Sequence, residues 1–179
     1  MLYMFGFERY GVVISDLYFV DPNPRHGQRG PERGVRLELR VLERGALRGS
    51  IYSAQPIAVE QPIWRVDLLE SVDGPVGSFD RAHHHPTLRN WEPGRRVFVD
   101  ELSADPLGWL GSQLSDLDAV LNRAGAPQHE ADAADAVALR ERAPEILAAV
   151  TRLLDGIKAG ALATPPGGES PKSARVGWL

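Results

Sequence analysis

The chain has 179 residues, of which 43% are hydrophobic and 25% charged, and it carries a formal net charge of −4 and no cysteine. A chain of this length can bury a core of its own. The lack of cysteine excludes disulfides, thiolate nucleophiles and cysteine-ligated metal sites. No apolar run approaches the roughly 20 residues of a membrane-spanning helix, and the first residues lack the basic segment of a secretory signal. We therefore expect a soluble, cytoplasmic protein without membrane contact.

Most of the first hundred residues have the pattern of β-strands. Tyr10 to Val20 is rich in β-branched and aromatic residues and ends at the cluster Asp21-Pro22-Asn23-Pro24, which breaks strands. After a loop, residues 35–41 alternate strictly between apolar and charged side chains. This period of two predicts a strand with one face buried.

Four further strands are predicted before residue 103. They span 50–59 (an edge or broken strand because of Pro56), 63–72, 76–81 (returning after the Asp73-Gly74 hairpin turn) and 96–102. Short strands joined by tight turns indicate an antiparallel sheet of five or six strands, arranged as a meander or a partly closed barrel. We assign residues 1–103 to this β domain.

The pattern becomes helical after residue 104. Asp105-Pro106 is an N-cap followed by proline at the first helical position, and leucines then recur every three or four residues until Gly125 ends the helix. A second helical region, 131–159, contains Pro144, which we expect to split it. Residues 104–162 are predicted to pack on the sheet and 163–179 to form a disordered tail, so the predicted fold class is α+β.

Arginine is concentrated in one part of the chain. Between Arg25 and Arg48 there are seven arginines and three glutamates. The planar guanidinium group suits phosphate, so Arg36 and Arg40 are candidate substrate-binding residues. The alternative interpretation is a solvated charged surface.

A histidine cluster is the segment most suggestive of chemistry. His83 and His85 project to the same face of an extended backbone, whereas His84 points away. The pair can share general acid and base roles, or hold a divalent metal with an oxygen from Asp80 or Glu92. In a third interpretation the histidines are structural, one bonded to a carbonyl at a strand end and the others solvated. His26 and His129 are expected at the surface.

Two family resemblances involve this cluster. Gly77, His83 and His85 match the opening of the cupin metal motif, but Arg89 and Asn90 occupy the place of its glutamate and the second cupin motif has no counterpart. Residues 35–122 resemble the TumE-type toxins of bacterial toxin–antitoxin pairs. The matching features, in order, are the Asp73-Gly74 turn, the segment Phe79-Asp80-Arg81-Ala82-His83-His84-His85-Pro86-Thr87-Leu88, Trp91-Glu92-Pro93 and the helix from Pro106. Gly94-Arg95-Arg96 stands where that family has a second histidine cluster.

The toxin resemblance implies a bacterial protein that acts on RNA and is neutralised by a cognate antitoxin. In this hypothesis His83 and His85 are the catalytic pair, Asp80 orients one imidazole, Arg81 and Arg89 bind charge, and no cofactor is needed. The principal alternative is a non-enzymatic interaction module that recruits a partner through the helical leucine stripes, including Leu114, and through Trp178-Leu179. A metal-dependent small-molecule enzyme is the third possibility. Phosphate-binding loops and dinucleotide-binding glycine motifs are absent.

Overall fold

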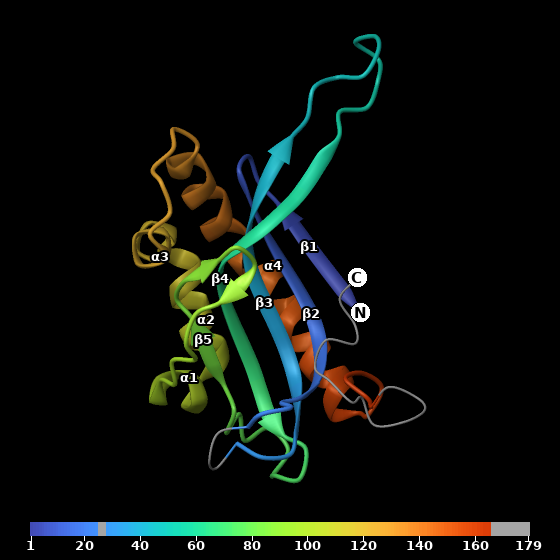
Figure 1. Cartoon of the computed structure of the whole chain (residues 1–179), viewed down its shortest axis with the longest axis vertical. Helices are drawn as coiled ribbons and strands as arrows, with labels where there is room; N and C mark the ends of the chain where they lie inside the picture. The colour runs from blue at the N-terminus through green and yellow to red at the C-terminus, as the bar shows by residue number, and fades with distance from the viewer. Residues whose placement is uncertain (25–27, 166–179) are drawn as a thin grey trace.

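A computed structural model describes residues 1–24 and 28–165 of the chain (Figure 1). Five antiparallel strands follow one another across the main sheet in chain order: β1 (Leu2–Gly6), β2 (Tyr10–Val20), β3 (Pro31–Arg44), β4 (Ile57–Ser71) and β5 (His83–His85). A small hairpin, β6 (Leu88–Arg89) and β7 (Glu92–Pro93), follows. The helices are α1 (Asp100–Ala104), α2 (Pro106–Ser115), α3 (Leu117–Ala124) and α4 (Asp132–Lys158). The α+β prediction is confirmed: the sheet is an open meander and does not close into a barrel.

One face of the sheet carries the hydrophobic core. The pairing register aligns Ile14 of β2, Leu37 of β3, Val66 of β4 and His84 of β5 in a single row. The first three are fully buried, and they share one core cluster with residues of α2, α3 and α4. Because side chains alternate along a strand, their sequence neighbours point to the opposite face, which the helices leave uncovered.

A buried carboxylate fixes α4 against the sheet. Asp135, in the first turn of α4, accepts hydrogen bonds from the backbone N–H groups of Glu8, Arg9 and Tyr10, each at 2.9 Å. These groups form the turn between β1 and β2. The side chain therefore satisfies donors that the turn would otherwise bury unpaired.

Several predicted strands differ from the observed ones. The first part of the strand predicted at 50–59 forms the tip of the hairpin between β3 and β4. The last part, from Ile57, is continuous with the next predicted strand, and together they form β4. The pairing of β3 with β4 shifts register at Arg40. This tip projects beyond the body of the molecule (Figure 1). Turns occupy 76–81, and only Val97 of 96–102 makes a strand-like bridge. β1 has no counterpart among the predicted strands.

Two helical predictions also need correction. The helix from Pro106 is interrupted at Asp116, whose carboxylate accepts the backbone N–H of Ala119 and so caps α3. Gly125 ends α3 in the left-handed conformation, as predicted. Pro144 does not split α4, because it lies on the exposed side, where solvent can satisfy the carbonyl that it frees. Burial of Ala143 and Ile146 on the other side holds the helix together.

The end of the predicted tail, 166–179, lies outside the described residues, as does His26. Ala163 is buried, and its N–H donates to Asp16. The leucine stripes of α2 and α3, which the interaction-module hypothesis offers to a partner, are buried: Leu110, Leu114, Leu117 and Leu121 are at most 5% exposed. Within the described part of the chain, no helix is long and apolar enough to cross a bilayer.

Gly34 of β3 is required by the close approach of β4. A Cβ atom at this position would lie 2.0 Å from the backbone oxygen of Leu68, whereas a Cβ at Gly6 would meet only a side-chain carbon at 3.6 Å. We predict that Gly34→Ala lowers the free energy of unfolding by about 1–3 kcal/mol, as overpacking does. Urea denaturation measures the effect, with Gly6→Ala as control. Equal stability of the two variants would contradict the prediction.

Candidate functional site

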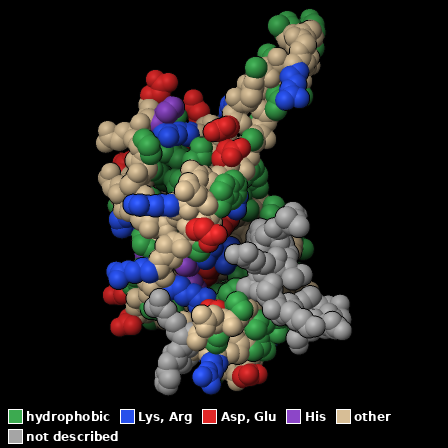
Figure 2. All heavy atoms as spheres, viewed as in Figure 1, with side chains coloured by type: hydrophobic (Ala, Val, Ile, Leu, Met, Phe, Trp, Pro, Cys, Tyr) green, Lys and Arg blue, Asp and Glu red, His purple; other side chains and the backbone are tan. Residues whose placement is uncertain are grey.

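A cleft of about 1130 Å³ opens on the face of the sheet that the helices leave uncovered. Basic, acidic and histidine side chains lie close together there in the space-filling view (Figure 2). Among the described residues, the charged groups that line it are five arginines (Arg36, Arg40, Arg65, Arg95, Arg96) and four carboxylates (Asp21, Glu38, Asp67, Glu92). His83 and His85 also line it. The shape and charge suit a polar ligand.

The register of three strands arranges the floor of this cleft. Arg36, Asp67 and His83 are direct cross-strand partners in one row. Glu38, Arg65 and His85 are partners in the next row. Positive and negative groups therefore alternate along β3 and β4, and each arginine faces a carboxylate on the neighbouring strand. Cross-strand pairs of opposite charge support the register.

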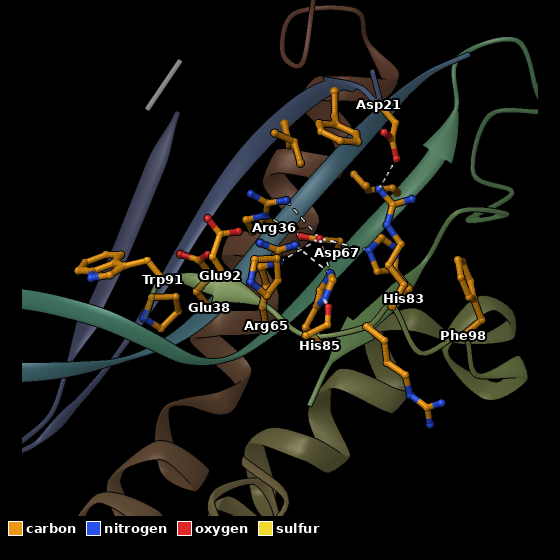
Figure 3. A pocket seen from close by; sticks show the side chains of 18 of the residues that line it. Asp21, Arg36, Glu38, Arg65, Asp67, His83, His85, Trp91, Glu92 and Phe98 are labelled. Carbon is orange, nitrogen blue, oxygen red and sulfur yellow. Dashed lines mark hydrogen bonds and ion pairs between the residues drawn. The ribbon is translucent and has the colours of Figure 1, made fainter. Parts of the chain in front are cut away.

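Asp67 is the centre of this arrangement (Figure 3). Its side chain is only 2% exposed, and Arg36 holds both carboxylate oxygens, at 2.7 and 3.2 Å. Arg65 Nε lies 3.1 Å from Oδ2. Burial by itself raises the pKa of Asp67, but the charges of Arg36 and Arg65 and a hydrogen bond from His83 outweigh it. The pKa therefore lies well below its usual range, and Asp67 is ionised.

Oxygen atoms lie next to both ring nitrogens of His83. Nδ1 lies 2.7 Å from the carbonyl oxygen of Arg81, to which it must donate. Nε2 lies 3.4 Å from Asp67 Oδ2. Both ring nitrogens thus face oxygen acceptors. Nε2 is buried, and none of the described residues makes a hydrogen bond of normal geometry to it.

The partners of His85 require a neutral ring. Nδ1 donates to the carbonyl oxygen of Gly94 at 2.8 Å, whereas Nε2 lies 2.9 Å from Arg65 Nη2, which can only donate. Burial, helped by the charge of Arg65, lowers the pKa of His85 to about 3. The two rings meet edge to face with centroids 5.0 Å apart. The cleft therefore holds two adjacent histidines whose ring nitrogens have different partners.

His84 belongs to the other face, as its position between His83 and His85 predicts. Its ring packs against Trp64 and Trp109, at centroid distances of 6.5 and 5.2 Å. Burial lowers the pKa of His84 to about 4. This histidine is a neutral member of the core.

Asp67, His83 and His85 form a buried group that can hold a metal ion, since one ligand atom from each lies within 4.8 Å of the others. Both imidazoles are oriented by backbone carbonyls at Nδ1, an arrangement also common among metal-binding histidines. Two guanidinium groups, however, already contact Asp67. A bound cation would have to tolerate or displace them.

The residues predicted to assist the histidines are dispersed. Asp80 accepts hydrogen bonds from Ser71 N and Ser78 Oγ, so its contacts lie in the loop between β4 and β5. Asp67, and not Asp80, supplies the carboxylate beside the imidazoles. Arg81 pairs with Asp80 at 3.3 Å. Arg89 is exposed on β6 and does not line the cleft.

Other predicted and unpredicted residues do meet in the cleft. Arg36 and Arg40 line it, as the phosphate-binding hypothesis requires, and Arg40 also pairs with Glu38. Sequence patterns did not single out Asp67 and Arg65, which also line the cleft, or the buried Glu32, which does not line it. Glu32 is 1% exposed, and burial raises its pKa, although Arg96 Nη1 lies 3.7 Å away and opposes the shift. The one available signal was the alternation of side chains along a strand, which places Glu32 on the same face of β3 as Arg36, and Arg65 on the same face of β4 as Asp67.

No family model, curated protein or solved structure matches this chain. The geometry of the cleft therefore carries the functional inference.

Asp67 should be the most costly carboxylate of the cleft to neutralise. Asp67→Asn leaves Arg36 and Arg65 buried without an anionic partner, so we predict a loss of about 3–5 kcal/mol in the free energy of unfolding. The half-exposed loop residue Asp80 serves as control, and Asp80→Asn should cost less than about 1 kcal/mol. Urea denaturation of both variants tests this, and comparable losses would contradict it.

The buried histidines should make the fold sensitive to mild acid. The folded-state pKa of His84, about 4, lies below its usual value of 6.5. Its stabilising contribution is thus complete above pH 6.5 and is lost as the pH falls toward 4. Between pH 7 and pH 5, His84→Phe should reduce the decline in unfolding free energy by roughly 1–2 kcal/mol. Denaturant titrations at the two pH values measure this, and an unchanged decline would refute it.

Proposed function

We propose that this chain is an RNA-cleaving enzyme of the TumE-like toxin type, in which His83 and His85 transfer protons at a scissile phosphate. The observation that carries the proposal is the difference between the hydrogen-bonding partners of the two imidazoles. Both ring nitrogens of His83 face oxygen atoms, whereas the partners of His85 require a neutral ring with a lone pair on Nε2. Cleavage of RNA by its own 2′-hydroxyl needs one proton acceptor and one proton donor.

The proposed reaction balances without a cofactor. His85 Nε2 takes the proton of the 2′-hydroxyl while the 2′-oxygen bonds to phosphorus. The bond from phosphorus to the 5′-oxygen breaks, and His83 Nε2 gives its proton to that oxygen. The products are a 2′,3′-cyclic phosphate and a 5′-hydroxyl. DNA has no 2′-hydroxyl and cannot react in this way.

The arginines of the floor account for substrate binding and for the activation of His85. Arg65 donates to His85 Nε2 in the free protein, at 2.9 Å. A phosphate entering the cleft offers this guanidinium an anionic acceptor, which frees Nε2. The same negative charge counters Arg65 and raises the pKa of His85 from its low value of about 3. Arg36 and Arg40 supply further positive charge on the same face.

A divalent metal at His83 and His85, completed by Asp67, is the second candidate. The convergence of these three side chains within 4.8 Å favours it. The contacts of Arg36 and Arg65 with Asp67 oppose it, because they place two positive charges beside the ion. We therefore rank acid–base chemistry first. Cleavage that disappears with EDTA and returns with Zn²⁺ or Mn²⁺ would reverse this order.

The proposal includes two partners, RNA as the substrate and a cognate antitoxin protein that neutralises the enzyme. The competing hypothesis of an interaction module loses its partner surface on α2 and α3, because their leucine stripes are buried in the core. Trp178-Leu179 lies outside the described residues.

Purified protein should cleave RNA, and removal of either histidine should slow cleavage. We predict that His83→Ala and His85→Ala each reduce the rate by about 10²–10⁴-fold, the usual contribution of a general acid or base. The measurement uses a labelled RNA in EDTA, and mass spectrometry identifies the cyclic phosphate. The control is His129→Ala, since His129 lies outside the cleft at the start of α4. The proposal fails if the wild-type chain leaves RNA intact or if the two variants cleave at its rate.

Controlled expression in bacteria tests the toxin assignment separately. Wild-type protein should arrest growth. The His83→Ala/His85→Ala double variant, shown to be folded by its circular dichroism spectrum, should not. Growth arrest by the folded double variant would exclude toxicity through these histidines.

A further inference from the structure

Two exposed aromatic rings border the histidine pair. Trp91 is 55% exposed and Phe98 is 49% exposed, yet both line the cleft. Trp91 lies on the side of His85 and Phe98 on the side of His83 (Figure 3). Large rings left open to solvent at the edge of a polar cleft are available for stacking.

The hairpin that orients His85 also holds Trp91. Asn90 and Trp91 form the turn between β6 and β7 with φ angles of 49° and 71°. This left-handed conformation is uncommon for a bulky residue such as tryptophan. Gly94, directly after β7, donates its N–H to Thr87 O and accepts the Nδ1–H of His85. The position of Trp91 is therefore linked to β5, the strand that carries His83 and His85.

A cation lies over the Trp91 ring. The Arg40 guanidinium carbon is 5.4 Å from the ring centroid. Arg40 thus brings positive charge next to an exposed aromatic surface, the combination with which proteins bind a nucleic-acid backbone and its bases.

Phe98 is fixed on the other side of the pair. Its ring centroid lies 5.4 Å from that of His83. The preceding residue, Val97, exchanges both backbone hydrogen bonds with His84. Hydrogen bonds thus join β5 to both of the segments that carry the exposed rings.

We propose that the cleft binds single-stranded nucleic acid, with a base stacked on Trp91, a neighbouring base stacked on Phe98, and the phosphate between them at the histidines and arginines. The ring faces of bases are accessible in a single strand but covered in a duplex. The identification of the cleaved strand as RNA rests on the function proposed above. The proposed stacking does not rest on that function, because RNA and DNA bases both present flat faces.

Binding of non-cleavable strands tests this inference apart from catalysis. Fluorescence anisotropy with the full chain would compare a labelled 12-nucleotide 2′-deoxy strand, its duplex and the 2′-O-methyl RNA of the same sequence, none of which has a 2′-hydroxyl to attack the phosphate. We expect both single strands to bind more tightly than the duplex. Trp91→Ala should weaken single-strand binding by about 5- to 150-fold, equivalent to about 1–3 kcal/mol for one stacked base. Trp91→Phe should retain most of the affinity.

The matched control is Tyr52→Ala. Tyr52 is 90% exposed at the tip of the hairpin between β3 and β4, and it does not line the cleft. Its replacement should leave binding unchanged. Thermal unfolding of each variant separates lost stacking from lost folding, and Trp91→Phe gives a second measurement if Trp91→Ala unfolds.

The outcomes distinguish this inference from the cleavage proposal. Trp91-dependent binding of the deoxy strand without cleavage of RNA supports the stacking surface and overturns the nuclease. RNA cleavage with equal affinity of wild type and Trp91→Ala overturns the stacking surface alone. Duplex binding as tight as single-strand binding, or no binding of either, also overturns it.

Discussion

The pairing register of β3, β4 and β5 is the constraint on which the rest of this molecule depends. It places Arg36, Asp67 and His83 in one row while Ile14, Leu37 and Val66 fill the row on the opposite face. A shift of one residue would move the charged groups into the core and the apolar groups into the cleft. Core packing therefore determines the register, and the register assembles the cleft.

The buried charge of Asp67 sets the chemistry of this cleft. A carboxylate removed from water is tolerated only when cations and hydrogen bonds replace its hydration. Arg36 and Arg65 supply them, and their positions then determine what surrounds the histidines. Burial, together with the charge of Arg65, keeps His85 neutral. The contrast between the two imidazoles is thus a consequence of neutralising one buried acid.

Local signals were sufficient where local geometry determines the structure. The extent of β2, the N-cap at Asp105 and the left-handed cap at Gly125 followed from short patterns of residue types. Predictions failed where packing outweighed the local preference. Pro144 stays inside α4 because buried neighbours hold the helix, and 76–81 forms turns rather than a strand, where Asp80 bonds back to Ser71. Asp67 has no local signature, since a single acid in a strand usually points to solvent.

The sequence by itself determined that His83 and His85 share a face and that His84 does not, because side chains alternate along any extended strand. It also determined the α+β class through the change from a period of two to a helical period. Only the tertiary structure decided which groups these histidines meet. Asp67, Arg36 and the Gly94 carbonyl come from separate segments. Their meeting depends on long-range strand pairing and loop paths, which no pattern within one segment encodes.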